Sequence, residues 1–208
     1  MEAAVERRML EQFKEIRQIE SPIELNDRCH MELKQVKEGG CLRIDGFTYR
    51  VQEVGRYEEK EDGGTWVWYE LKLYCLETGQ TVDLEWEFDD EYEISFTVKK
   101  LKKKDIKYDD GSAFVMGDVE EAIEEEEDLV VSGKIFEYDD DSETTYFRNN
   151  GDKGEFVRLY DFKSTSTDEG LTIEEWGTKG SYEYIAFVSR PVKARDIEII
   201  SLSGLSVN

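Results

Sequence analysis

Two segments of this 208-residue chain match each other, and this match constrains the fold more than any other feature of the sequence. Residues 81–106 read TVDLEWEFDDEYEISFTVKKLKKKDI, and residues 171–197 read LTIEEWGTKGSYEYIAFVSRPVKARDI. The corresponding positions are Trp86 and Trp176, Tyr92 and Tyr182, and the triplets Lys104-Asp105-Ile106 and Arg195-Asp196-Ile197. Self-similarity at a long period indicates duplication of one supersecondary unit, in which each copy covers the apolar face of the other.

The repeated segments lie in a longer region that has the two-residue period of β-strands. From Cys41 onward, runs rich in Val, Ile, Tyr, Phe and Trp alternate with turn residues such as Asp45-Gly46 and Thr78-Gly79. An Asp-Gly step allows the positive φ that a tight hairpin needs. The predicted strands are 41–45, 47–58, 65–76, 80–88 and 92–100 in a first series, and 129–138, 143–149, 154–163, 170–177, 181–189 and 196–202 in a second.

These two series predict a mainly β fold of the α+β class, in which two related antiparallel β units form a sandwich or a barrel-like pair. Residues 39–106 are the first β unit and residues 129–208 the second. Residues 107–128 are an acidic connector that contains the segment VEEAIEEEEDL. We expect one or two helical turns in this connector, which is too charged to belong to the core.

Residues 1–38 are predicted to be an N-terminal helical segment, either a single helix or a helical pair. Apolar residues recur on one face of residues 2–20, and Ser21-Pro22 ends that helix. A second, weaker helix is predicted over residues 24–37. The apolar stripes dock on the β core of the same chain, on a second subunit in a homodimer, or on a partner protein.

The charge of the chain limits its partners. It carries 50 acidic and 27 basic residues, a formal net charge of −23. Phosphate backbones and anionic headgroups are normally bound through Lys and Arg, so we expect neither nucleic acid nor lipid surfaces as partners. An aromatic content of 12% indicates a folded chain, because disordered acidic chains are poor in aromatic residues.

The sequence also predicts a cytoplasmic protein without direct membrane insertion. No apolar run approaches the roughly 20 residues that cross a bilayer, and the first residues lack a signal-peptide core. The cysteines Cys29, Cys41 and Cys75 include no CxxC pair and are typical of reduced thiols.

Few residue patterns in the chain indicate catalysis or metal binding. His30 is the only histidine, which excludes Ser-His-Asp, Cys-His and multi-histidine sites within one chain. No glycine-rich phosphate-binding loop occurs. The acidic clusters 89–91, 124–128 and 139–141 lack EF-hand spacing, and we interpret them as solvated turns and surfaces. We therefore expect no enzymatic activity, no catalytic residues, no metal site and no cofactor.

Several motifs of the first β unit are similar to those of a known family. They are Gly40, Tyr49-Arg50-Val51, Trp68-Tyr69-Glu70-Leu71 and Leu84-Glu85. In these motifs, residues 39–106 resemble the DUF4178 family, an uncharacterised β-rich domain, and with the second unit the resemblance reaches about residue 200. The resemblance implies a small cytosolic accessory protein, of a kind often encoded near membrane-stress or ion-channel proteins, with a role in assembly. It implies no activity and no functional residues.

These observations together predict a non-enzymatic acidic interaction or assembly module with a protein partner, which we expect to be basic. The resemblance implies that such a module is accessory to a membrane-stress or channel-related system. The alternative is a small-ligand or divalent-cation binding protein with an aromatic groove. For both hypotheses the candidate binding residues are the four tryptophans in the predicted strands: Trp66, Trp68, Trp86 and Trp176.

Overall fold

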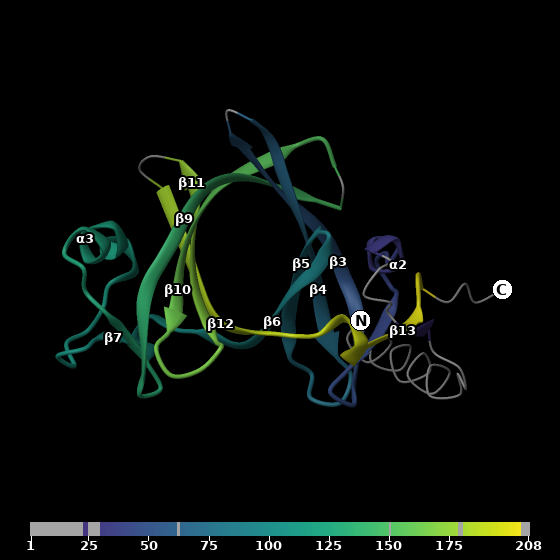
Figure 1. Cartoon of the computed structure of the whole chain (residues 1–208), viewed down its shortest axis with the longest axis horizontal. Helices are drawn as coiled ribbons and strands as arrows, with labels where there is room; N and C mark the ends of the chain where they lie inside the picture. The colour runs from purple at the N-terminus through teal and green to yellow at the C-terminus, as the bar shows by residue number, and fades with distance from the viewer. Residues whose placement is uncertain (1–22, 25–29, 62, 150, 179–180, 205–208) are drawn as a thin grey trace, which may run out of the picture. The chain divides into compact units, whose positions relative to one another are not determined.

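The computed structural model describes residues 23–24, 30–61, 63–149, 151–178 and 181–204 (Figure 1). Their contacts divide them into two compact lobes. Lobe 1 contains the described residues of 1–54, 69–94 and 192–208, and lobe 2 contains those of 55–68 and 95–191. Each lobe therefore contains segments from both the first and the second half of the sequence.

The elements are mostly strands. They are β1 (Ile23–Glu24), β2 (Cys41–Ile44), β3 (Phe47–Glu61), β4 (Gly64–Cys75), β5 (Thr81–Asp89), β6 (Glu91–Leu101), β7 (Ile106–Tyr108), β8 (Leu129–Val131), β9 (Lys134–Arg148), β10 (Gly154–Ser164), β11 (Gly170–Thr178), β12 (Ser181–Pro191) and β13 (Ile197–Ser201). The helices are α2 (His30–Lys34) and α3 (Val119–Glu124), with 3-10 turns η1 (Lys103–Asp105), η2 (Met116–Asp118) and η3 (Ala194–Asp196).

The strands follow the order β1-β13-β2-β3-β4-β5-β6-β12-β11-β10-β9-β8-β7, and β3 also pairs with β9. The eight strands from β3 to β9 in this order therefore close on themselves, which is the strand order of an antiparallel barrel with extra strands at both ends. This order confirms the predicted mainly β, antiparallel class. A closed ring removes the unpaired edges that an open sheet exposes.

The two halves of the chain have the same element order. Strands β2 to β6 with η1 and β7 match β8 to β12 with η3 and β13, and both β3 and β9 have 15 residues. The turns Asp45-Gly46 and Ser132-Gly133 both have positive φ at each residue. The last strand of each half pairs with the first strand of the other, because β7 pairs with β8 and β13 with β2. The halves are thus interleaved, and duplication remains our interpretation of this shared order.

The predicted strands 129–138 and 143–149 are wrong at their boundaries. Strand β8 is short, the chain turns at Ser132-Gly133, and β9 then continues through residues 139–141 to Arg148. Pairing with β10 changes from Asp140 opposite Asp161 to Tyr138 opposite Phe162, so a β-bulge accommodates the extra residue in the acidic run. The acidic run is thus part of a strand and not a turn.

The acidic connector also differs from the prediction that it is too charged for the core. Helix α3 buries Val119 and Ala122, and the segment before it buries Phe114 and Met116. These apolar side chains pack in the main core of lobe 2, while most of the acidic residues of the helix face solvent. A three- to four-residue spacing is enough to put one apolar face on an otherwise acidic helix.

The predicted N-terminal helix at 2–20 lies outside the described residues, as does any dimer contact through it. The second predicted helix, 24–37, is wrong at its bounds, because Glu24 belongs to β1 and the described helix α2 ends at Lys34. Leu33 and Val36 from this segment are buried in lobe 1. Within the described ranges, no helix has the length and apolar character that crossing a membrane requires.

Cys41 and Cys75 are buried free thiols, and burial raises the pKa of the Cys41 thiol to about 11.

Strand β10 separates two apolar clusters of lobe 2. Tyr160 and Phe162 belong to the main core with α3, whereas Val157 and Leu159 point to the opposite face, as the two-residue period requires. On that opposite face they pack with Tyr57 and Tyr146, and with the partly exposed Trp68 and Trp176. This second cluster forms the base of the candidate site described below.

Candidate functional site

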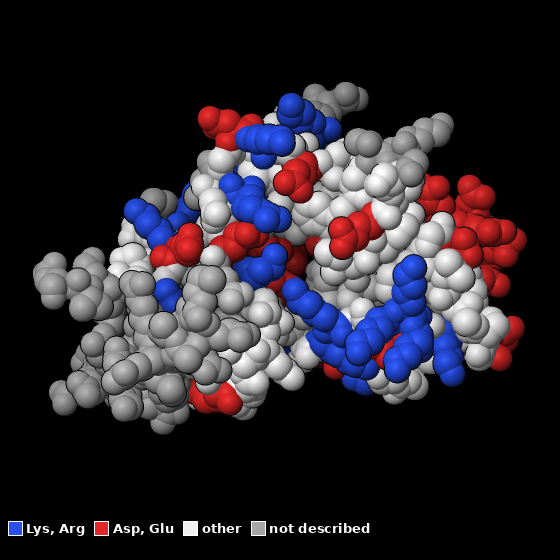
Figure 2. Space-filling view, turned by 180° about the vertical axis from the view of Figure 1, so that it is seen from behind, with Lys and Arg blue, Asp and Glu red and all other residues white. Residues whose placement is uncertain are grey.

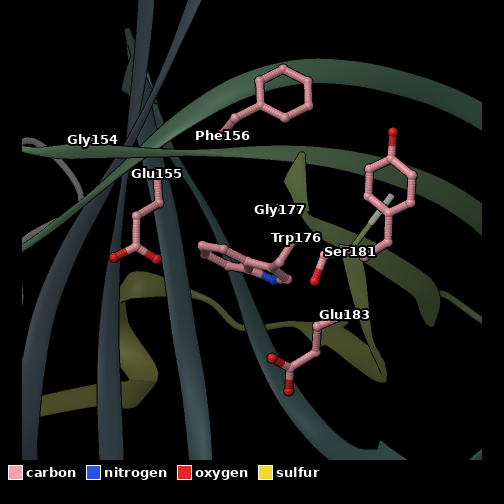
Figure 3. A pocket seen from close by; sticks show the side chains of 8 residues that line it. Gly154, Glu155, Phe156, Trp176, Gly177, Ser181 and Glu183 are labelled. Atoms are coloured by element: carbon pink, nitrogen blue, oxygen red, sulfur yellow. The ribbon is translucent and has the colours of Figure 1, made fainter. Parts of the chain in front are cut away.

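A pocket of about 480 Å³ opens on lobe 2 where β10 and β12 begin and β11 ends (Figure 3). It is lined by Gly154, Glu155, Phe156, Trp176, Gly177, Ser181, Tyr182 and Glu183. Because β10, β11 and β12 are neighbours in the sheet, the antiparallel order brings these strand ends together. The pocket volume is in the range of small-molecule and side-chain binding sites.

Trp176 is held in the pocket by contacts below it. Its indole Nε1–H donates a hydrogen bond to Glu174 Oε2 at 2.8 Å, and Tyr146 packs at right angles to it, with ring centroids 5.3 Å apart. Glu174 is only 5% exposed and also accepts a hydrogen bond from the Tyr57 hydroxyl, at 3.1 Å. A buried carboxylate therefore fixes two aromatic side chains, and Tyr57 in turn stacks on Trp68 at 5.3 Å.

The pocket lining combines aromatic rings with carboxylates. Phe156 is 42% exposed and Tyr182 is 44% exposed, and both carboxylate side chains, Glu155 and Glu183, reach solvent. In Figure 3 the carboxylates of Glu155 and Glu183 lie on the same side of the strands as the indole of Trp176, whereas the Phe156 ring points to the other side of β10. No lysine or arginine occurs among the lining residues that the structure describes. The electron-rich ring faces and the negative charges all favour a cationic ligand.

The first half of the chain has a different arrangement at the equivalent position. Trp86 faces Tyr69 across β4 and β5, stacks on it at 5.4 Å, and is only 3% exposed. Trp176 faces Val157 across β10 and β11, and a valine side chain is too small to cover an indole. Trp176 therefore stays partly exposed.

A second difference between the halves lies two residues before each tryptophan. Leu84 occupies this position in the first half and pairs with Leu71, whereas Glu174 occupies it in the second half and pairs with Leu159. Both positions are buried, so the first half has an apolar side chain where the second has a carboxylate. The polar base of the pocket is thus particular to the second half.

The structure brings two of the four predicted tryptophans together. Trp68 and Trp176 pack against the same small cluster in lobe 2, and of the four it is Trp176 that lines the pocket. Trp86 is part of the core of lobe 1, and Trp66 is 52% exposed near the start of β4. The binding role of all four remains a prediction.

The other residues of the site were not predicted from the sequence: Tyr57, Glu155, Phe156, Glu174, Tyr182 and Glu183. Glu174 could have been found, because a spacing of two residues puts it on the same strand face as Trp176. Tyr57 is 117 residues away from Glu174 in the sequence, so no local pattern indicates their hydrogen bond.

Asp161 is a carboxylate on the same face of the sheet as Glu174, and its pKa is raised. Asp161 accepts a hydrogen bond from Thr172 Oγ1 at 2.6 Å, and the two residues are paired across β10 and β11. Burial, followed by the nearby charges of Asp139 and Asp140, raises the pKa of Asp161 to about 6. Within the described part of the chain, no group of three or more His, Cys, Asp or Glu side chains has the arrangement of a metal site.

Charged side chains are grouped on the surface and not evenly mixed. Figure 2 shows basic side chains gathered in places and acidic ones in others. The exposed lysines of one basic group are Lys99, Lys100, Lys102, Lys103 and Lys104. Asp105 lies next to them, and the backbone N–H of Lys102, together with the lysine charges, lowers the pKa of its carboxyl. The pocket lining contains none of these lysines.

The profile of DUF4178, described as a domain of unknown function, matches residues 37–194. Neither the curated proteins nor the solved structures include a significant match. The matched region covers most of the chain, spans both halves and contains every lining residue of the pocket. The chain therefore belongs to the DUF4178 family.

Proposed function

We propose that this protein is a non-enzymatic binding module that holds a basic segment of a partner protein in the pocket beside Trp176. The observation that carries the proposal is the buried Glu174 carboxylate, which fixes a partly exposed indole. Stability does not require this arrangement, because Leu84 and the covered Trp86 fill the equivalent positions in the first half with apolar contacts. Burying a carboxylate is costly, so its presence under a pocket supports a binding role.

The charge of the partner follows from the lining and from the whole chain. Glu155 and Glu183 provide negative charge at the pocket, and the chain has a net charge of −23. Such a field increases the association rate with a basic protein and disfavours acidic ones. Binding should therefore weaken as salt concentration rises.

The pocket lining supports binding and not catalysis. Ser181 and Tyr182 carry the hydroxyls of the lining, and the described lining residues include no histidine or lysine that would activate them. We interpret the indole of Trp176 and the exposed carboxylates as a recognition surface.

A free small-molecule cation is a second candidate ligand. A volume of about 480 Å³ lies within the range of pockets that bury small ligands, and the same rings and carboxylates would recognise it. A peptide and a free cation differ in their need for flanking contacts, so the two candidates are separable by experiment.

The proposal is tested with an array of synthetic peptides of graded charge, probed with the purified full-length chain. We expect the wild-type protein to bind a subset of the basic peptides and none of the acidic ones. Trp176→Ala should weaken this binding at least about tenfold, in line with the loss of an interface anchor. Trp66→Ala is the matched control, because it removes an exposed indole that does not line the pocket.

Two results would count against the proposal. One is the absence of peptide binding by a wild-type protein whose unfolding in urea is cooperative. The other is equal binding by the wild-type and Trp176→Ala proteins, which would place the contact elsewhere. Binding of a panel of free organic amines without any peptide binding would favour the second candidate.

A further inference from the structure

We infer that the group which enters the pocket is the guanidinium of an arginine side chain. This inference rests on the proposed function and identifies the chemical group that the same pocket binds. The indole of Trp176 and the carboxylates of Glu155 and Glu183 lie on one face of the sheet, because Trp176 pairs with both Val157 and Glu183 and Glu155 lies two residues before Val157. Phe156 and Tyr182 also line the pocket, but their side chains alternate to the other face. A ligand that fits the indole and both carboxylates needs a flat apolar face and several N–H donors at its edge.

Guanidinium has both properties, and ammonium has only one of them. A guanidinium is planar and weakly hydrated, stacks on aromatic faces, and donates paired hydrogen bonds to carboxylates. A lysine ammonium is a compact, strongly hydrated charge that loses more solvation when it is placed against aromatic rings. A partly exposed indole with two carboxylates on the same face of the sheet therefore favours arginine.

The protein already uses this combination twice within lobe 2. The guanidinium carbon of Arg56 lies 4.2 Å from the centre of the Phe147 ring, and its Nε donates to Glu58 at 2.8 Å. Arg158 lies 5.1 Å from the centre of the Tyr160 ring, and one of its terminal nitrogens is 3.0 Å from Asp141. In both places an aromatic face and a carboxylate hold one guanidinium, as the pocket is proposed to do for a partner.

Glu174 has the role of a positioning residue in this account. Its Oε2 accepts the indole N–H of Trp176, so that N–H is engaged below the pocket and the ring keeps one orientation. The ligand is then recognised by the face of the Trp176 indole and by Glu155 and Glu183. Replacing Glu174 should broaden the indole resonance and weaken binding without removing any ligand contact.

The test uses three short glycine-serine peptides that are identical except for one central residue: arginine, lysine or citrulline. Citrulline keeps the planar shape of arginine and removes its charge. The readout is the indole N–H resonance of Trp176 in the full-length protein, assigned with Trp176→Phe. We expect saturable shifts with the arginine peptide, about tenfold weaker binding of the lysine peptide, and no saturation with citrulline.

Paired variants test the role of the carboxylates. Glu155→Gln combined with Glu183→Gln should weaken binding of the arginine peptide about tenfold, while the melting temperature stays unchanged because both side chains are exposed. Glu137→Gln is the matched control, since Glu137 is an exposed carboxylate of the same lobe that does not line the pocket. It should leave the affinity unchanged.

Several results would overturn the inference. Equal affinity for the arginine and lysine peptides would show that the pocket recognises a positive charge and not the guanidinium group. The proposed binding function would then stand. Saturable binding of the citrulline peptide would exclude a cation. If basic peptides from the array bind but the arginine peptide does not shift the Trp176 resonance, the inference fails alone. If no basic peptide binds in either experiment, the proposed function fails with it.

Discussion

Tyr69 covers Trp86 because the two side chains face each other across β4 and β5, with ring planes 24° apart. At the equivalent register in the second half, Val157 faces Trp176. Two tryptophans that match in the internal repeat thus have different environments, and the residue on the opposite strand decides which one is buried. The stability of the chain should depend on them unequally.

Alanine substitution of each tryptophan measures this difference. Trp86→Ala should lower the free energy of unfolding by about 3–5 kcal/mol, because it removes a side chain that is almost fully buried. Trp176→Ala should lower it by about 1–2 kcal/mol, since part of the indole is already in contact with water. Urea denaturation followed by circular dichroism gives both values. Equal losses would contradict the finding that Trp86 is buried in the core of lobe 1 while Trp176 is only partly buried.

Gly55→Ala should disturb the base of the pocket through Tyr146. A Cβ atom at position 55 would overlap the Tyr146 hydroxyl and ring, and Tyr146 in turn contacts Tyr57 and Trp176. We expect a loss of about 1–3 kcal/mol in the free energy of unfolding and a displaced Trp176 indole resonance. Gly64→Ala is the control, because its Cβ would meet no neighbouring atom. An unchanged indole resonance in Gly55→Ala would disprove the predicted coupling.

Local patterns in the sequence predict most of the strands but not their continuity. The alternation around Trp68 marks β4, and the Asp45-Gly46 turn marks the hairpin of β2 and β3, because both signals lie within a few residues. The acidic run 139–141 has the composition of a turn, yet it stays in β9 because a β-bulge against β10 accommodates it. Register and bulges depend on the partner strand, which local patterns do not contain.

The candidate site could be predicted from the sequence only in part, because some of its contacts depend on which strands are paired. The spacing of Glu174 and Trp176 places both on one face of β11, and the internal repeat draws attention to Trp176. The exposure of Trp176 depends on Val157, and the second hydrogen bond of Glu174 depends on Tyr57 from another strand. Both facts follow from strand order, and the strand order is a property of the whole fold.

Arg158→Gln should loosen helix α3 without unfolding the protein. Arg158 connects β10 to Asp141 on β9 and to Glu120 on α3. These ion pairs are partly exposed, so the expected loss in the free energy of unfolding is about 1 kcal/mol or less. Amide hydrogen exchange in Val119–Glu124 should become faster, as measured by mass spectrometry.

Lys163→Gln is the matched control for this variant. Lys163 pairs with Asp139, but its side chain is 74% exposed and the pair does not involve α3. Exchange in Val119–Glu124 should stay at the wild-type rate in this variant. Faster exchange in both variants, or in neither, would exclude the predicted link between Arg158 and the helix.

Asp161→Asn should make the protein more stable at neutral pH and less sensitive to pH. Burial and the charges of Asp139 and Asp140 raise the pKa of Asp161 to about 6 in the folded chain, above its value in the unfolded chain. The folded state therefore binds more protons between these two pKa values, so stability falls as pH rises through this interval and stays low above pH of about 6.

Urea denaturation at pH of about 5 and about 8 tests this prediction. At the higher pH, Asp161→Asn should exceed the wild type in free energy of unfolding by about 1–3 kcal/mol, because the neutral amide avoids the buried charge and can still accept the hydrogen bond from Thr172. At the lower pH the difference should shrink as Asp161 becomes protonated. A variant that is less stable than the wild type at pH of about 8 would show that the charged carboxylate is favourable in the folded state.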